Sequence, residues 1–184
     1  MERVETDREL VARCQGGDET AFTALVTRHQ HRALNVAYQL LRNHEDAVEV
    51  AQDAFVSIYR NIGRFRGECE FTTWLHRIVV NLARNKQRWW QRRGRPAAVS
   101  LDDPNQPQFA AVAEWPDAQA AQAEFVGRLH DEMGRLPAKF REVLVLRNVE
   151  ELSYDEIAVA LRCSVGTVKS RIARAREELR RRLQ

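Results

Sequence analysis

The sequence predicts an all-α protein built from two small helical domains joined by a flexible linker. Apolar residues recur at helical spacing through most of the 184 residues, and the few β-branched stretches fit the same period. Residues that favour helix caps precede the periodic segments. Between residues 94 and 116, Gly94, Pro96, Pro104 and Pro107 interrupt any regular helix. A stretch of this length without structure is unusual inside one compact domain, so we expect a domain boundary there.

The N-terminal domain, residues 1–93, is expected to hold four helices. A capping box at Thr6–Glu9 opens the first helix, and Gly16-Gly17 ends it. The remaining caps are predicted at Asp18 for the second helix, Asn43 for the third and Thr72 or Thr73 for the fourth. The third helix should end near Gly63 and the fourth near Arg92, with a short loop between them.

The C-terminal domain, residues 117–184, is expected to begin with a helix that runs to about Gly134. Leu136-Pro137 opens the next helix. A second capping box, Ser153–Glu156, precedes a short helix that ends at Leu161. Ser164 is placed to cap a last helix from Val165 to about Leu183. Residues 153–176 therefore have the pattern of a helix-turn-helix.

The last predicted helix has two different faces. Val168 and Ile172 would pack against the preceding short helix, whose Ala158 is small enough for a close crossing. The opposite face carries the candidate DNA contacts Thr167, Lys169, Ser170, Arg171 and Arg174. In a recognition helix such residues meet base edges and phosphates of duplex DNA. An ordinary helical hairpin with a basic solvent face is the alternative. The run 180–182 is either a set of further phosphate contacts or a complement to the helix dipole.

Charge is distributed in blocks, although the formal net charge is only +3. Residues 71–101 contain no Asp or Glu, whereas residues 96–127 contain no Lys or Arg. Such blocks suggest surfaces with different partners, with plain solvated helix faces as the alternative.

Other classes of site find little support. The cysteines, Cys14, Cys69 and Cys163, lie far apart, which fits a reducing cytoplasm and buried structural thiols. No signal peptide or membrane span is expected. We predict no metal and no cofactor. Asp46, Glu49 and Asp53 share a helix face and could hold a metal in a nucleic-acid enzyme, but no histidine joins them, so we predict that the protein is not an enzyme.

Two sets of motifs resemble the extracytoplasmic-function (ECF) sigma factors of bacteria. The C-terminal set is Leu136-Pro137, Arg141-Glu142-Val143, Leu152 to Ala158, Val165 to Arg171 and Ala175-Arg176. The N-terminal set is Glu45-Asp46-Ala47, Gln52 to Phe55, Phe71 to Leu75, Arg77-Ile78 and Asn81. The sets occur in the family's order and cover nearly the whole chain.

The resemblance implies a sigma factor that binds core RNA polymerase and promoter DNA. Region two would contact the polymerase clamp helices, open the downstream (minus ten) element and capture a flipped base. Region four would read the upstream (minus thirty-five) element. The matching polymerase contacts are Asp46, Glu49, Gln52 and Asp53. The matching downstream positions are the loop from Arg64 to Phe71, with Phe65 and Phe71 as contacts, and the helix that contains Asn81. The charge pattern adds Arg77, Arg84 and Lys86 as phosphate contacts, because they are basic residues in the stretch without Asp or Glu. An anti-sigma partner is also implied.

The residue chemistry agrees with these roles, because an unpaired base needs ring faces, amides and nearby positive charge. Core packing is the favoured role for Trp74, Leu75 and Ile78. Trp89 and Trp90 could stack on nucleic acid or pack against the linker, and both interpretations stay open. A stand-alone helix-turn-helix regulator is the alternative function. It would bind duplex DNA alone, but it leaves the acid-free stretch after Phe71 unexplained.

Overall fold

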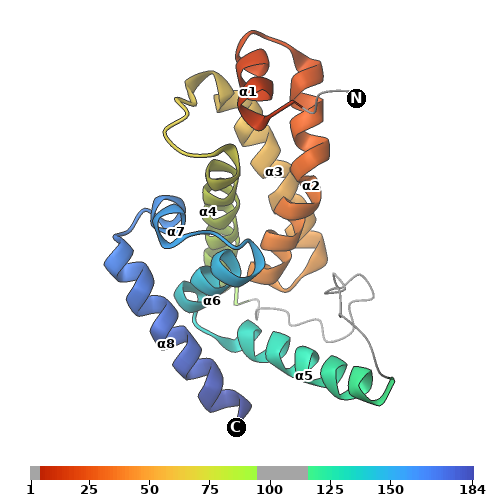
Figure 1. The fold of residues 1–184 in the computed structure, drawn as a ribbon, viewed down its shortest axis with the longest axis vertical. Helices are drawn as coiled ribbons and strands as arrows, with labels where there is room; N and C mark the ends of the chain where they lie inside the picture. The colour runs from red at the N-terminus through yellow and green to blue at the C-terminus, as the bar shows by residue number, and fades with distance from the viewer. Residues whose placement is uncertain (1–4, 95–115) are drawn as a thin grey trace.

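The computed structural model describes residues 5–94 and 116–184 (Figure 1). The N-terminal unit contains α1 (Asp7–Gln15), α2 (Glu19–Leu41), α3 (His44–Asn61), the short 3-10 helix η1 (Ile62–Arg64) and α4 (Phe71–Arg92). The C-terminal unit contains α5 (Pro116–Arg135), α6 (Ala138–Leu144), the π-helical turn η2 (Val145–Val149), α7 (Tyr154–Leu161) and α8 (Val165–Leu183). No strand occurs in these ranges, which confirms the predicted all-α fold. The expected linker, residues 94–116, lies outside the described residues except at its two ends.

Side-chain caps start the helices of the N-terminal unit largely as predicted. Thr6 and Glu9 form a reciprocal capping box, Asp18 accepts hydrogen bonds from Thr20 and Ala21, and Asn43 accepts one from Asp46. These bonds satisfy backbone N–H groups that the first turn of a helix leaves without partners.

The prediction for the start of α4 was wrong. The helix begins at Phe71 with Glu70 at the N-cap, and neither Thr72 nor Thr73 caps it. Phe71 and Trp74 are both buried, and a backbone that is already helical at Phe71 brings these two side chains, three positions apart, to one face. Burial of the first turn therefore outweighs the missing side-chain cap.

The C-terminal unit ends in two helices joined by a tight turn. Ser153 and Glu156 form the second capping box, and Ser164 caps α8 by accepting a hydrogen bond from Thr167. Arg162 ends α7 in the left-handed conformation, at φ 52° and ψ 52°. Its backbone N–H donates to the carbonyls of α7, so the turn closes although no glycine is present. The predicted helix-turn-helix is therefore confirmed.

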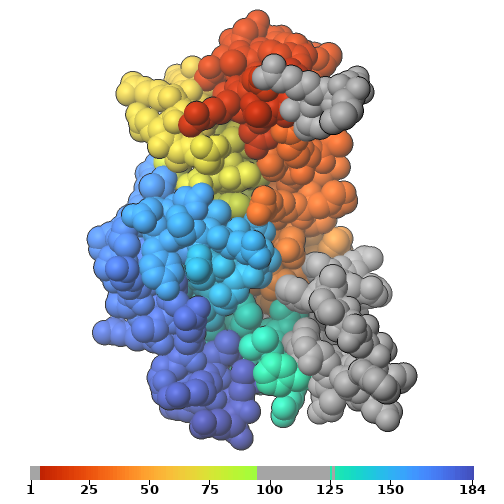
Figure 2. Space-filling model, viewed as in Figure 1, coloured from red at the N-terminus to blue at the C-terminus, as the bar shows by residue number. Residues whose placement is uncertain are grey.

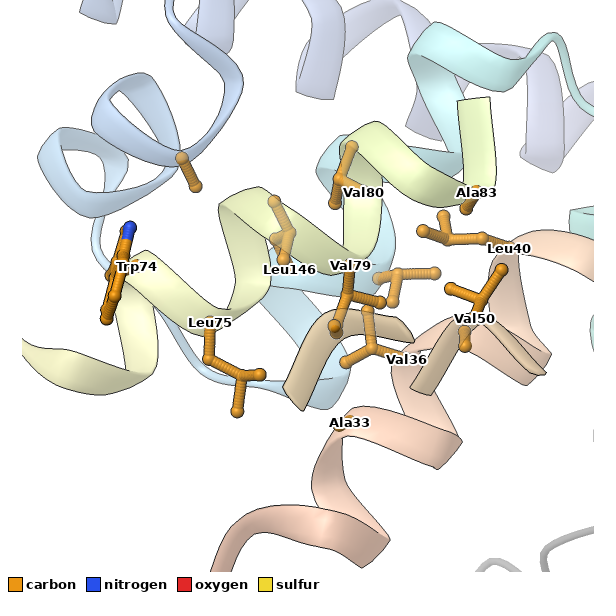
Figure 3. Packing of buried hydrophobic residues seen from close by; sticks show 14 of the residues in the cluster. Ala33, Val36, Leu40, Val50, Trp74, Leu75, Val79, Val80, Ala83 and Leu146 are labelled. Carbon is orange, nitrogen blue, oxygen red and sulfur yellow. The ribbon is translucent and has the colours of Figure 1, made fainter. Parts of the chain in front are cut away.

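The two units pack against each other through a shared apolar core. Figure 3 shows Leu146 of η2 beside Val79 and Val80 of α4, close to Leu75. All four side chains are fully buried. On the visible face, the C-terminal unit lies directly against the N-terminal unit (Figure 2). Segments far apart in sequence, α4 and α7 above all, thus lie side by side (Figure 1).

Candidate nucleic-acid interface

One candidate DNA surface is the solvent side of α8. Val168, Ile172 and Ala175 are buried against the rest of the unit. The five predicted contacts lie outside this buried stripe: Lys169, Ser170 and Arg174 are exposed, and Thr167 and Arg171 are half-buried. A helix held in this way by a second helix can enter the major groove with the N-terminal part of its exposed face.

The arginines at the end of α8 are already paired within the protein. Arg180 contacts Glu177 at 2.6 Å, Arg181 contacts Glu178 at 2.8 Å, and Arg182 contacts Glu178 at 2.8 Å. Arg182 also lies 3.6 Å from Glu132 of α5. Exposed pairs of this kind contribute little energy, so they break readily in favour of a phosphate.

A second candidate surface is a cavity of about 660 Å³ beside α4, which we call the α4 pocket. Phe65 stacks on Trp74 at its wall, with ring centroids 4.6 Å apart and an angle of 18° between the planes. The lining residues are Ser57, Asn61, Arg64, Phe65, Arg66, Glu68, Cys69, Trp74, Arg77, Ile78, Asn81, Val159 and Arg162. Four of them are arginines and one is a glutamate. The pocket thus combines an aromatic face, amides and positive charge, as base capture requires.

Hydrogen bonds from α1 hold the loop that carries Phe65 in place. The side-chain amide of Gln15 donates hydrogen bonds to the carbonyls of Ile62 and Phe65, at 3.0 and 2.8 Å. Gly67 adopts φ 70°, a conformation that glycine reaches without a steric penalty. These contacts fix the position of the Phe65 ring relative to α4.

Phe65, Arg77 and Asn81 come together in the α4 pocket, whereas Phe71 does not. The Phe71 side chain is only 3% exposed and lies in the core, with its ring centroid 5.3 Å from that of His29. It presents no ring face to a base in this conformation, so we withdraw it as a DNA contact. The first turn of α4 uses it as a core anchor instead. Trp74 and Leu75 are also buried, as favoured from the sequence.

Arg84 and Lys86 are not free for phosphate contact in this conformation. Arg84 donates two hydrogen bonds to Glu142 of α6, at 2.7 and 2.6 Å, and these bonds raise its pKa. The Lys86 ammonium lies 2.9 Å from Asp46 and 2.6 Å from Glu49. Burial opposes its charge, but the two carboxylates outweigh burial and raise the pKa of Lys86.

The four predicted polymerase contacts lie on α3 with different exposure. Gln52 and Asp53 are exposed, and Glu49 is exposed although it pairs with Lys86. Asp46 is 7% exposed, and its carboxylate is directed at Lys86. Glu49, Gln52 and Asp53 are therefore accessible on α3, whereas Asp46 is buried and pairs with Lys86.

The two tryptophans at the end of α4 differ in burial. Trp90 is buried at 3% exposure. Trp89 is half-buried, with the Arg93 guanidinium 4.4 Å and the Lys86 ammonium 5.7 Å from its ring centroid.

The three cysteines, Cys14, Cys69 and Cys163, are all half-buried and form no disulfide. Burial raises the pKa of the Cys14 and Cys69 thiols, which disfavours the reactive thiolate.

Several residues of the α4 pocket were not singled out from the sequence. Arg64 and Arg66 flank Phe65, and this alternation of cations with an aromatic ring could have indicated them. Gln15 carries no recognisable signal, because its role depends on how α1 packs. The contribution of Val159 and Arg162 depends on the packing of the two units and is equally invisible in the sequence.

Within residues 5–94 and 116–184, no three His, Cys, Asp or Glu side chains are grouped to hold a metal ion. No helix in these two ranges is long and apolar enough to cross a membrane.

Comparison with known proteins identifies the family. Residues 25–95 match the family model of sigma-70 region 2, and residues 127–179 match that of sigma-70 region 4. The RNA polymerase sigma-H factor of Pseudomonas aeruginosa is 38% identical, over 98% of this chain and 95% of that protein. The ECF RNA polymerase sigma-E factor of Escherichia coli is 37% identical, over 97% and 95% of the two chains.

A solved structure shares the fold over nearly the same length. The structure of CnrH in complex with the cytosolic domain of CnrY has a TM-score of 0.68 and 28% identity, and it covers 95% of both chains. The family matches correspond to the two units that carry the α4 pocket and the α8 surface. The chain therefore belongs to the sigma-70 family as an ECF-type RNA polymerase sigma factor, a protein that directs promoter-specific transcription initiation.

Proposed function

We propose that the two DNA surfaces divide promoter recognition between them. Residues 1–93 bind core polymerase and open the downstream element, residues 117–184 read the upstream element, and residues 94–116 connect them. The observation that carries this proposal is that the matched regions present two chemically different surfaces. One is a basic helix face suited to duplex DNA, and the other is a pocket suited to an unpaired base.

On α8, Thr167, Lys169, Ser170, Arg171 and Arg174 form the upstream contact. Arg171 is the strongest candidate for a base contact. It lies about two turns into the helix and is half-buried, beside the buried stripe that packs on the rest of the unit. Arg174 lies one turn further along and is exposed, which favours a phosphate contact.

In the α4 pocket, the Phe65 ring offers a stacking surface and Asn81 offers an amide for the edge of a flipped base. Arg77 supplies positive charge for the adjacent phosphate. Arg84 and Lys86 extend this basic side of α4 once their carboxylate partners are released. The single-stranded DNA of the opened downstream element is thus the ligand of this pocket.

On α3, Glu49, Gln52 and Asp53 form the contact with core polymerase, and Lys86 with Asp46 holds Glu49 in place. CnrH is solved in complex with another protein, the cytosolic domain of CnrY, which supports a protein partner for this chain as well. We propose that this partner is an anti-sigma factor. We assign the protein to the cytoplasm and no catalytic activity of its own. Family membership favours this function over a stand-alone regulator.

The test is in vitro transcription with purified bacterial core polymerase and a library of promoter fragments. Initiation at a defined subset of promoters should require this protein. Asn81→Ala should reduce open-complex formation on the selected promoters, whereas Asn148→Ala, at an exposed asparagine of η2, should not. Tight duplex binding by the protein alone, without polymerase-dependent initiation, would instead support the regulator.

A further inference from the structure

The aromatic wall of the α4 pocket is one end of a row of packed rings. Phe65 stacks on Trp74 at the pocket, and the Phe71 ring meets Trp74 edge-on, with ring centroids 6.2 Å apart and an angle of 76° between the planes. The His29 ring of α2 comes next, with its centroid 5.3 Å from that of Phe71. His29, Phe71 and Trp74 are buried, whereas Phe65 is only half-buried. Phe65 is therefore the ring whose position the core alone does not fix.

Helix α1 contacts both ends of this row of rings. At the N-terminal end of α1, a carboxylate oxygen of Asp7 lies 2.8 Å from Nε2 of His29. At its C-terminal end, Gln15 reaches the segment that carries Phe65. In Figure 1, α1 and the loop before α4 lie at the same end of the N-terminal unit. No residue of α1 lines the α4 pocket, so α1 supports the aromatic wall from outside the pocket.

The Gln15 amide holds two points of the backbone at once. Its nitrogen donates hydrogen bonds to the carbonyls of Ile62 and Phe65, at 3.0 and 2.8 Å. These carbonyls flank η1, in which the backbone N–H of Phe65 donates to the Ile62 carbonyl at 3.0 Å. An amide nitrogen carries two hydrogens in a fixed plane, so it restrains both carbonyls together. The direction in which the Phe65 side chain leaves the backbone is thereby set.

The loop has few other restraints of its own. Residues 64–70 are exposed except for Phe65 and Cys69, which are half-buried. Arg8 of α1 lies 3.5 Å from Glu70, but the two side chains are 79% and 58% exposed, and such a pair contributes little. A segment with little buried surface opens easily unless specific hydrogen bonds hold it. The placement of Phe65 therefore depends strongly on Gln15.

The proposed function places an unpaired base against the Phe65 ring. Stacking between a base and an aromatic side chain requires the ring to lie at a defined place and angle. A ring that is free to move loses that freedom when a base stacks on it, and this loss weakens binding. Holding the ring in advance therefore strengthens capture of the base without any contact between Gln15 and DNA.

We propose that Gln15 is a positioning residue for strand capture, and that through it α1 controls how tightly the α4 pocket holds an unpaired base. This inference rests on the proposed function of the α4 pocket. Gln15 acts on the base only through Phe65, because Gln15 lies outside the lining of the pocket. It also lies before residues 25–95, the segment that matches sigma-70 region 2.

The test is a thermodynamic cycle between Gln15 and the captured base. The protein is assembled with core polymerase. The probe is a fork-junction fragment of a promoter selected in the transcription test, duplex upstream and single-stranded through the downstream element. An abasic site is moved along the single strand, one position at a time. In the wild type, one position should weaken binding by about tenfold, because the base that stacks on the pocket wall is missing.

Two variants remove the hydrogen bonds of Gln15. Gln15→Glu keeps the length of the side chain, but its carboxylate has no hydrogen to donate, and Gln15→Ala adds no charge. We expect both to weaken binding of the intact fork by about fivefold and of the abasic fork by less than about twofold, since the place of the ring matters only when a base is present. Gln30→Glu, at an exposed position of α2, should match the wild type on both forks.

Two outcomes would overturn the role of Gln15. Equal weakening of both forks by the Gln15 variants would indicate a general loss of stability, because such a loss acts whether or not the base is present. Unchanged binding of both forks would show that Phe65 is placed without the Gln15 amide.

Asn81→Ala separates this inference from the proposed function. Asn81 lines the pocket, so its loss should reduce the effect of the abasic site. If Asn81→Ala reduces that effect and both Gln15 variants retain it in full, the pocket captures a base without help from α1, and only the role of Gln15 is refuted. If no abasic position weakens binding of the wild type, the α4 pocket captures no base, and the proposed function itself fails.

Discussion

The guanidinium of Arg84 on α4 forms a bidentate ion pair with the carboxylate of Glu142 on α6, through hydrogen bonds of 2.7 and 2.6 Å. Paired hydrogen bonds between these groups fix orientation as well as distance. A side chain that the sequence assigns to DNA therefore holds the two units together in the free protein. Phosphate contact and unit packing compete for the same arginine.

Replacing Arg171 with alanine should weaken recognition of the upstream element by about 1–3 kcal/mol, if the guanidinium contacts a base. The measurement is competition between promoter fragments that differ only in the upstream element, bound by the assembled polymerase. Arg180→Ala is the matched control, because Arg180 lies at the far end of α8 and pairs with Glu177. An unchanged preference in Arg171→Ala would remove the assignment.

Replacing Asp53 with lysine should weaken association with core polymerase, since an exposed carboxylate becomes a cation on the proposed contact face of α3. Association is measured by titrating labelled protein with core polymerase in the absence of DNA. Glu19→Lys makes the same change of charge at an exposed site in the first turn of α2. If both variants bind polymerase equally well, α3 does not contact it through Asp53.

Acid should loosen the packing of α5 against α2 through His130. Burial, followed by the charge of Arg42, lowers the pKa of His130 from 6.5 to about 4. The groups that face it are Gln39, Arg42 and the Tyr38 ring from α2, with Asp131 beside it on α5. A solvent-exposed His130 takes up a proton below about pH 6.5, whereas the packed one stays neutral to about pH 4. The stability of this contact is therefore present above pH 6.5 and is lost as pH falls toward 4.

By pH 5.5 this loss should amount to about 1 kcal/mol. It is measured by chemical denaturation and X-ray scattering at pH 7.5 and 5.5. His130→Gln should reduce the difference, whereas His31→Gln, at an exposed position of α2, should leave it unchanged. His29 should contribute a residual loss of the same sign, because burial also lowers its pKa. An identical pH response in the wild type and in His130→Gln would contradict the prediction.

Removing the cap of α7 should destabilise the helix-turn-helix. Ser153 accepts a hydrogen bond from the Glu156 backbone at 3.2 Å, and Ser153→Ala should lower the free energy of unfolding by about 1 kcal/mol. Thermal unfolding followed by circular dichroism measures this effect. Thr27→Ala is the control, because the Thr27 hydroxyl bonds only to a carbonyl within α2. Equal losses in the two variants would argue against a specific capping contribution.

Much of the fold could be predicted because its signals are local. Thr6, Asp18, Asn43, Ser153 and Ser164 all cap the helices that the sequence assigned to them. The start of α4 could not be found in this way, since burial of Phe71 rather than a cap sets it. The exposed face of α8 follows from helical periodicity alone.

The arrangement of the two units could not be predicted, because it depends on contacts between distant residues. Arg84 and Glu142 are 58 positions apart, and Gln15 reaches a carbonyl 50 positions away. Charge pattern suggested that Arg84 and Lys86 were free to meet phosphates. Each carboxylate that holds them lies on another helix, and only the packed structure brings them together.

Arg42 ends α2 in the left-handed conformation, at φ 57° and ψ 29°, where glycine or asparagine would fit with less strain. An arginine there costs the isolated turn about 1–2 kcal/mol. It places a guanidinium in contact with His130 and 3.3 Å from Asp131 of α5. Arg42 thus adopts an unfavourable backbone conformation at one turn, and its side chain links that turn to residues 88 and 89 positions further along the chain.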